Sequence, residues 1–304
     1  MPPRSPLPQR HGLDAAWVRT PGPGDGAAIS WATMRDFLVV RLPAHAEVER
    51  RLSAGEFVDS SGHPWSGDEA YRPHVFVWFH RPLAPETPVP FEVDVLAQHD
   101  RYVVVDKPPF LATTPRGAHA RETALVRLRV ALDLPELAPA HRLDRLTAGV
   151  LLFTTRREHR GAYAGVFQGR RATKTYEAIA PVDPTLEFPR TLVGRIEKRR
   201  GELQARIVPG EPNASTDVDV LEVRGAWARY RLTPLTGKTH QLRVQMATLG
   251  LPIAGDPLYP DVVDVPADDF SRPLQLIARR LAFTDPVDGT PVAFESRRAL
   301  EWPG

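Results

Sequence analysis

The order of apolar and polar residues along the chain predicts many strands with a few helices inserted between them. Runs of β-branched and aromatic residues, which favour strands, occupy residues 75–79, 102–105 and 150–153. Successive strands with only short connections predict an α+β fold with a mixed, largely antiparallel sheet. Further strand patterns cover residues 174–180, 191–197, 203–208, 215–223 and 228–233, and a last hairpin of 281–284 with 291–294 closes around Asp288-Gly289.

Three segments have the 3.6-residue period of an amphipathic helix: residues 122–132, 156–167 and 239–249. The third is followed by Gly250, which suits a helix C-terminus, and then by Pro252, which cannot continue a helix. These helices are expected as insertions between the strands.

Changes in composition divide the chain into four parts. Residues 1–28 are rich in proline and glycine, have few apolar anchors and are expected to form a flexible leader. Residues 29–81 predict short helices followed by a β-hairpin, a small α+β module whose Arg-Leu-x-x-Gly-Glu-Phe-Val sequence resembles the S4-type RNA-binding module. Prolines make residues 82–90 a stiff linker, and residues 91–304 then form the main domain.

Composition places the chain among ordinary globular proteins. Of its 304 residues 42% are hydrophobic and 25% charged, and the formal net charge is only +2, so a nucleic-acid partner would have to be bound by a local basic patch. The basic residues are almost all arginine, whose fork suits phosphate. A composition so rich in Arg, Pro and Ala can equally reflect codon bias.

The sequence contains no cysteine, which excludes disulfides, thiolate nucleophiles and cysteine-ligated zinc. This fits a reducing compartment. The chain has no run of about 18 apolar residues, and its first residues lack the apolar core of a signal peptide. We therefore expect a cytoplasmic protein without a membrane span, and a monomer.

The densest polar chemistry lies in His141-Arg142-Leu143-Asp144-Arg145-Leu146-Thr147-Ala148-Gly149. Asp144 stands between two arginines just before a predicted strand, and a carboxylate beside guanidinium groups is expected to stay ionised at neutral pH. Loops at the ends of strands often carry functional residues. A purely structural ion pair is an equally good interpretation of this pattern.

Two further stretches place polar residues where a plain core would need none. Lys107-Pro108-Pro109-Phe110 ends a predicted strand, and Thr236-Gly237-Lys238-Thr239-His240-Gln241-Leu242-Arg243 brings a glycine turn to the start of a helix. Main-chain N–H groups at such a start favour an anion such as phosphate. A capped helix with solvated Lys238 and Arg243 is the alternative.

Together these stretches resemble the motifs of the RluA-type pseudouridine synthases. Residues 141–153 resemble the catalytic motif of that family, and residues 236–244 with 249–259 resemble its C-terminal signature. Residues 107–112 resemble its early motif, with Pro109 where glycine is usual, and residues 174–178 resemble its tyrosine strand. The four motifs occur in the order of the family, within residues 94–297.

The resemblance implies three catalytic residues. Asp144 would be the essential carboxylate that begins to break the C1′–N1 bond of the target uridine. Arg243 would pair with Asp144 and keep it ionised and aimed. Tyr176 would pack on the target uracil, and it is a candidate for removing the C5 proton after the base is re-attached.

The resemblance also implies residues that bind the substrate. Arg142 would enter the RNA stack as the target base leaves, and Leu242 would line the base pocket. Extruding a base from folded RNA costs a few kcal/mol. The remaining substrate-binding residues would be Lys107, Lys238 and His240.

The implied reaction is an isomerisation of specific uridines, which needs no cofactor and no metal. The lack of cysteine and of a His-x-x-x-His pattern agrees with this. The implied partner is a structured RNA, a stem-loop of ribosomal or transfer RNA, because sequence-specific RNA readers use unstacked bases.

The residues by themselves allow other functions. An aspartate acting at an anomeric carbon also occurs in glycoside hydrolysis, but that chemistry generally needs a second carboxylate, for which no partner motif is present. A non-catalytic RNA-binding protein or RNA chaperone on the same fold is the main alternative. An aspartate-dependent nucleosidase that releases free base is a third.

Contact with RNA outside the pocket is expected from clusters of basic residues, although each cluster could also be a solvated face. The chain departs from the family pattern at Gln245, Pro260 and Ile277, which concerns the subgroup and the RNA substrate rather than the reaction. The basic clusters are Arg156, Arg157 and Arg160; Arg170, Arg171 and Lys174; and Lys198, Arg199 and Arg200.

Overall fold

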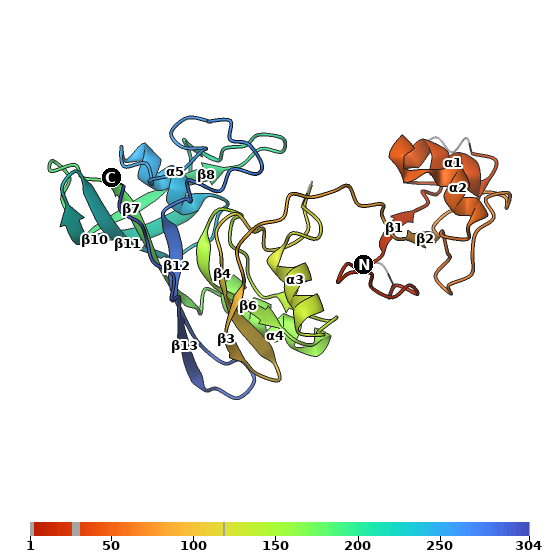
Figure 1. The fold of residues 1–304 in the computed structure, drawn as a ribbon, viewed down its shortest axis with the longest axis horizontal. Coiled ribbons are helices and arrows are strands. Elements are labelled where there is room, and N and C mark those ends of the chain that lie inside the picture. The colour runs from red at the N-terminus through yellow and green to blue at the C-terminus, as the bar shows by residue number, and fades with distance from the viewer. Residues whose placement is uncertain (1–2, 26–30, 118, 304) are drawn as a thin grey trace. The chain divides into compact units, whose positions relative to one another are not determined.

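The computed structural model describes residues 3–25, 31–117 and 119–303, and it divides into two units, Met1–Pro85 and Glu86–Gly304 (Figure 1). Each unit has a buried hydrophobic core of its own. The two units are therefore described separately.

In the first unit a two-stranded antiparallel sheet packs with short helices. Thr33 begins the first helix with a capping box, because its side chain accepts the N–H of Asp36 while the Asp36 carboxylate accepts the N–H of Thr33. Met34, Phe37 and Leu38 of this helix are fully buried. The elements are β1 (Ala16–Arg19), α1 (Met34–Arg41), the 3₁₀ turn η1 (Ala44–Ala46), α2 (Val48–Ser53) and β2 (Phe76–Phe79).

One expectation for this unit is wrong, and a second is confirmed only in part. Ala16–Arg19 lies within the expected flexible leader, yet it forms β1 and pairs with Phe76–Phe79. The reason is a short apolar run, Ala15-Ala16-Trp17-Val18, which supplies core contacts despite the surrounding prolines. The expected hairpin is present only in part, because β2 pairs with β1 along its length and with the preceding segment only through an antiparallel bridge between Trp78 and Val58. Residues 1–2 and 26–28 of the expected leader lie outside the described residues.

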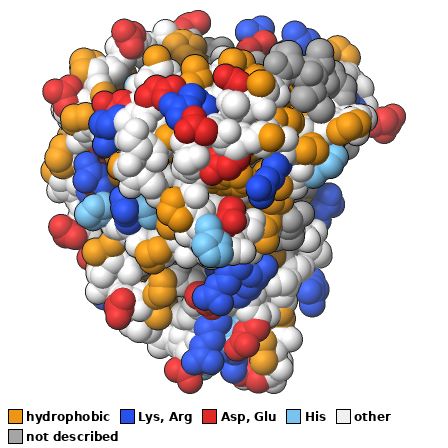
Figure 2. All heavy atoms as spheres, turned by 90° about the vertical axis from the view of Figure 1, so that its right-hand side faces the viewer, with side chains coloured by type: hydrophobic (Ala, Val, Ile, Leu, Met, Phe, Trp, Pro, Cys, Tyr) orange, Lys and Arg blue, Asp and Glu red, His pale blue; other side chains and the backbone are white. Residues whose placement is uncertain are grey.

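Many arginines of the first unit are held in ion pairs. Arg35 pairs with Asp68, and Arg50 pairs with Glu47. On the face that Figure 2 shows, acidic and basic side chains lie next to one another. The resemblance of this unit to an S4-type RNA-binding module stays a prediction.

The connection between the units is shorter than the expected linker. Residues 80–93 form neither helix nor strand. From Glu86 onward, however, they pack on the second unit, where the Glu86 carboxylate accepts the main-chain N–H groups of Ala120 at 2.9 Å and Arg121 at 2.8 Å. Val89 is buried, and its carbonyl accepts a hydrogen bond from Arg127. The free connection therefore ends near the boundary at Pro85.

One large sheet organises the second unit. Its strands lie in the order β3-β4-β6-β12-β7-β11-β10-β8-β9, with β13 paired to β12 and β5 paired to β6. Within the described residues β6 and β12 pair in parallel, and the other pairs are antiparallel. The predicted α+β fold with a mixed, largely antiparallel sheet is therefore confirmed.

The strands of this unit are β3 (Asp94–Gln98), β4 (Tyr102–Lys107), β5 (Ala138–Pro139), β6 (Ala148–Thr154), β7 (Thr173–Pro181), β8 (Arg190–Glu197), β9 (Arg206–Val208), β10 (Ala214–Arg224), β11 (Trp227–Pro234), β12 (Leu276–Thr284) and β13 (Pro291–Glu295). The helices are α3 (Ala124–Ala131), the 3₁₀ turn η2 (Arg157–His159), α4 (Arg160–Gln168) and α5 (Gln241–Thr248). The three helices predicted for this region are confirmed, each somewhat shorter than its pattern.

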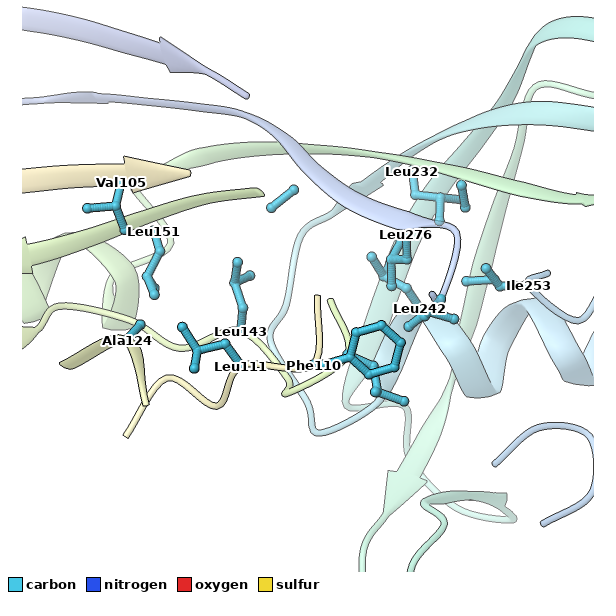
Figure 3. Packing of buried hydrophobic residues seen from close by; sticks show 14 of the residues in the cluster. Val105, Phe110, Leu111, Ala124, Leu143, Leu151, Leu232, Leu242, Ile253 and Leu276 are labelled. Carbon is cyan, nitrogen blue, oxygen red and sulfur yellow. The ribbon is translucent and has the colours of Figure 1, made fainter. Parts of the chain in front are cut away.

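The central strands β4 and β6 are buried on both faces of the sheet. Val105 of β4 and Leu151 of β6 lie in the core that includes Ala124 of α3, as Figure 3 shows. Their neighbours in the chain turn to the opposite face, where Leu152 packs with Tyr163 of α4. Because both faces are covered, these strands need a continuous apolar run and not an alternating one.

Gly149 allows the parallel junction between β6 and β12. It has a φ of +111°, and a Cβ placed on it would lie 2.3 Å from the carbonyl oxygen of Ala278, so a side chain does not fit. Ala278 pairs with Gly149 on one side and with Tyr176 of β7 on the other. The glycine of the central motif therefore brings the loop before β6 close to the tyrosine strand.

Candidate active site

Asp144 lies on the loop that leads into β6, and the residue before it is fixed by a buried threonine. The Thr113 hydroxyl donates to the carbonyl of Leu143 at 2.8 Å and accepts the N–H of Leu143 at 3.2 Å. The carbonyl of Asp144 itself accepts the N–H of Thr147 at 3.1 Å. These hydrogen bonds hold the backbone at Asp144 in place. The Asp144 side chain is one-third exposed and therefore reaches solvent.

His141 fixes the start of the same loop. Its ring stacks on Phe167 with centroids 4.3 Å apart, and its Nε2 accepts the main-chain N–H of Leu152 at 3.1 Å. Burial lowers the pKa of His141 to about 3. The imidazole is therefore neutral at neutral pH, as an acceptor must be.

Lys107 holds the other side of the loop. Its ammonium donates to the carbonyls of Pro108 at 2.8 Å, Leu111 at 2.8 Å and Arg145 at 3.2 Å. Burial lowers the pKa of Lys107, while the charge of Asp144 opposes this; the three carbonyls match the three N–H donors of the charged form. The expected role of Lys107 in binding substrate is wrong, because the side chain is completely buried and its donors are used within the protein.

The early motif also contains a left-handed residue. Phe110 has a φ of +65°, and it is Phe110, not Pro109, that occupies the conformation favouring glycine. Its ring packs against Phe91 and Phe270, with centroids 6.1 Å and 5.3 Å away. The aromatic packing at this position therefore offsets the conformational cost of placing a bulky side chain at positive φ.

The cation beside Asp144 comes from α5. Arg243 Nη1 lies 3.7 Å from Asp144 Oδ2, and Nε and Nη2 of Arg243 bind Asp256 at 2.7 and 2.6 Å. Burial disfavours the charge of Arg243, but the hydrogen bonds and charge of Asp256 outweigh it and raise the pKa of Arg243. Within the described residues Arg142 and Arg145 make no ion pair with Asp144, so the expectation that they clamp it is wrong.

Tyr176 is half-buried at the middle of the sheet and packs against the main core, which also contains Leu242. Burial, and then the charge of Asp144, raise the pKa of Tyr176. The phenol therefore keeps its proton at neutral pH. Both expected roles of Tyr176, packing on the target uracil and removing the C5 proton, stay predictions.

His240 immediately precedes α5, and its ring lies near Asp144. It has a φ of +57°, its Nδ1 lies 3.0 Å from the Tyr259 hydroxyl, and its Nε2 lies 4.0 Å from Asp144 Oδ2. Arg243 and His240 thus approach the same carboxylate oxygen.

Lys238 and Arg142 are exposed, and their expected contact with substrate stays a prediction. The main-chain N–H of Lys238 donates to the side chain of Gln241 at 3.0 Å, so this N–H does not contribute to the anion site expected at the start of α5.

The structure thus gathers Asp144, Arg243, His240 and Tyr176 from a loop, a helix and a strand that are far apart in the sequence. The sequence-based prediction missed Asp256 and Thr113. Asp256 follows Gly255, where a Cβ would lie 2.4 Å from the carbonyl of Pro273, so the Gly-Asp pair of the C-terminal signature was an available signal. Nothing in the local sequence marks Thr113.

Residues 101–248 match the sequence model of the RNA pseudouridylate synthase family. The dual-specificity RNA pseudouridine synthase RluA of Yersinia pestis is 30% identical over 215 residues, which cover 66% of this chain and 97% of the relative. The chain belongs to the RluA-type RNA pseudouridine synthase family. The resemblance drawn from the four motifs is thereby confirmed.

Other members of the RNA pseudouridine synthase family are longer than the matched region. The ribosomal large subunit pseudouridine synthase D of Neisseria meningitidis serogroup A is 30% identical over 224 residues, and the chain spans 59% of its length. The human pseudouridylate synthase RPUSD2 is 34% identical over 187 residues, and the chain spans 33% of it. The solved structure of human RNA pseudouridylate synthase domain containing 1 has a TM-score of 0.55 and 26% identity, covering 68% of this chain and 84% of that one.

The residues that the structure describes in this RNA pseudouridine synthase family member contain no group of three or more His, Asp or Glu side chains placed to hold a metal ion. No helix among them combines the length and apolar character needed to cross a membrane.

Proposed function

We propose that the protein is an RNA pseudouridine synthase that isomerises specific uridines of ribosomal or transfer RNA. The C1′–N1 bond breaks, the uracil turns, and C5 joins C1′. The observation that carries this proposal is the one-third exposed carboxylate of Asp144, 3.7 Å from the buried guanidinium of Arg243, in a chain of this family. A carboxylate beside a permanent cation is ready to act on the sugar at neutral pH.

The other residues support this chemistry. Tyr176 and Leu242 offer an aromatic and an aliphatic surface for the uracil, and a flipped base is commonly held by such surfaces. Arg142 is exposed on the loop of Asp144, where it can fill the space that the base leaves in the RNA. The protein needs no cofactor in this proposal, and we further propose that it acts as a cytoplasmic monomer.

The function is tested on RNA transcribed without modification. Purified protein is incubated with ribosomal and transfer RNA transcripts, and the RNA is digested to nucleosides and separated by chromatography with mass detection. The appearance of pseudouridine together with a loss of uridine supports the proposal. Free uracil would instead indicate a nucleosidase, and binding without any change would indicate an RNA-binding protein. Carbodiimide mapping then locates the modified uridine.

Affinity for RNA is expected to fall steeply with salt, because basic side chains displace counterions from phosphates. Lys198, Arg199 and Arg200 are exposed on one loop. Replacing all three with alanine is expected to reduce the slope of log affinity against log salt concentration by about 2 units, at roughly 0.7–0.9 per lost phosphate contact. Filter binding at salt concentrations from about 50 to about 300 mM measures this slope.

The matched control replaces each basic residue of this loop with the other basic residue type, so the charge of the loop stays the same. In that variant Lys198 becomes arginine, and Arg199 and Arg200 become lysine. It is expected to keep the wild-type slope. Equal slopes for the alanine variant and the wild type would show that this loop does not contact phosphates.

A further inference from the structure

A chain of buried hydrogen bonds joins the helix that carries Arg243 to the main sheet. Gln241 and Gln245 of α5 are four residues apart and share one face of the helix, while Arg243, two residues from each, points away from that face. Thr216 of β10 binds both glutamines. All three polar side chains are buried, and Thr216 is only 1% exposed. They therefore bind other groups of the protein rather than solvent.

Main-chain groups determine the direction of each bond at the Gln245 end of this chain. The carbonyl of Leu192 on β8 can only accept a hydrogen bond, so the amide nitrogen of Gln245 donates to it at 2.9 Å. The amide oxygen of Gln245 then faces Thr216 and accepts its hydroxyl proton at 2.7 Å. Because Thr216 has a single hydroxyl proton, its oxygen can only accept from any further partner.

The Gln241 end gives the same directions independently. The main-chain N–H of Lys238 can only donate, so the amide oxygen of Gln241 accepts it at 3.0 Å. The amide nitrogen of Gln241 then donates to the carbonyl of Ser215 at 3.1 Å and to the hydroxyl of Thr216 at 2.9 Å. Thr216 thus accepts from one glutamine and donates to the other, and the whole chain has one consistent arrangement.

These bonds hold the position of α5 more sharply than its apolar contacts do. The helix has eight residues, and Leu242 and Met246 pack in the main core. Apolar burial has no preferred direction, whereas a hydrogen bond weakens steeply as its geometry departs from the ideal. A partly satisfied buried network is also costly. The helix is therefore held where all the bonds of the chain are made.

The position of α5 matters because Arg243 and Asp144 come from different parts of the chain. Arg243 Nη1 lies 3.7 Å from Asp144 Oδ2, and the loop of Asp144 is fixed separately by the bond of Thr113 to Leu143. A shift of α5 along β10 would therefore change the separation of the two charged groups.

We propose that Thr216, Gln241 and Gln245 are positioning residues for the isomerisation. Their hydrogen bonds set where α5 lies on β10 and β8, and thereby set the separation between Arg243 and Asp144. None of the three acts on the substrate itself. This inference rests on the proposed function, because it assigns these residues an effect on the same reaction.

The test compares two substitutions of Thr216 in the full chain, with pseudouridine formation on ribosomal and transfer RNA transcripts as the activity. Thr216→Val keeps the shape of the side chain but removes the hydroxyl, whereas Thr216→Ser keeps the hydroxyl and removes the methyl group. For Thr216→Val we expect kcat per folded molecule to fall about 10- to 100-fold, the size of effect that a small misplacement of reacting groups can have. KM for RNA is expected to change little. Thr216→Ser is expected to keep a kcat close to that of the wild type.

A second substitution tests whether the residues act as one chain. Gln245→Met has nearly the shape of glutamine but can neither accept from Thr216 nor donate to Leu192. It is expected to lower kcat as Thr216→Val does. Because both substitutions break the same bond, the double variant is expected to lose much less than the product of the two single effects. Circular dichroism gives the folded fraction by which each kcat is corrected.

Each other outcome contradicts a stated part of the proposal. A wild-type kcat per folded molecule in Thr216→Val overturns it, and so does an equal fall in Thr216→Ser, which would indicate packing rather than the hydroxyl. Multiplying effects in the double variant would show that the residues do not act together. If Thr216→Val does not fold, Gln245→Met decides by its kcat and KM. If the wild-type protein forms no pseudouridine, the proposed function is contradicted, whereas an active wild type with unaffected variants contradicts only this inference.

Discussion

Replacing Asp144 with asparagine is expected to lower kcat on the order of 10⁴-fold or more, because removing a nucleophilic residue has effects of this size or larger in enzymes. The amide has nearly the shape of the carboxylate, but it cannot supply the negative charge that acts on the sugar. The backbone around it is held by Thr113, His141 and Lys107 through bonds that do not involve the Asp144 side chain. The fold is therefore expected to survive the substitution.

Pseudouridine formation on the transcripts measures this effect, and filter binding of the same RNA measures affinity. RNA affinity should change by less than about tenfold, since a single uncharged contact is worth about 1 kcal/mol. Asp144→Glu is the matched control: it keeps the charge, moves it by one methylene and is expected to retain part of the activity. Substantial turnover by Asp144→Asn would show that another group performs the first step.

Replacing Arg243 with methionine is expected to destabilise the protein by about 3–5 kcal/mol and to abolish activity. The reason is Asp256, whose side chain is completely buried and loses the partner of two hydrogen bonds. The free energy of unfolding, measured by urea titration, should show the loss directly. Activity is lost in addition because Asp144 no longer faces a cation.

A double variant separates these two effects. Arg243→Met combined with Asp256→Asn removes both charges of the buried pair, and an asparagine oxygen can still accept the N–H of Leu258, now 2.9 Å from Asp256 Oδ1. Replacing a buried pair as a whole is far less costly than breaking it. We expect most of the lost stability to return while the activity stays absent. If activity returned with stability, Arg243 would have only a structural role.

The sequence predicted most elements of the main sheet because their cause is local. The run from Val150 to Phe153 is apolar throughout, which a strand buried on both faces requires. The cause of Gly149 is not local, since a side chain there would meet Ala278, which is far along the chain. β1 was missed because its four residues stand among prolines, and its partner Phe76–Phe79 is far along the chain.

The site was predicted less well, because its geometry depends on distant contacts. The local pattern favoured the two arginines next to Asp144 as its partners, whereas the family resemblance pointed to Arg243, which approaches Asp144 from α5. Lys107 belongs to a recognisable motif, but only the fold shows that three carbonyls surround its ammonium. Sequence motifs thus identified most of the residues that gather around Asp144, whereas the contacts that each of them makes depend on tertiary packing.

The parallel junction at Gly149 has a consequence for how the catalytic machinery is assembled. It joins one continuous stretch of chain, from β3 to α4, to another, from β7 to β13, through the register pairs Ile277–Ala148 and Ala278–Gly149. The first stretch carries Asp144, and the second carries Tyr176, His240 and Arg243. Neither stretch alone carries all four of these residues, so the proposed activity requires the two stretches to pair at this junction. A chain cut in the loop between α4 and β7 is therefore expected to form pseudouridine only after its two parts are combined.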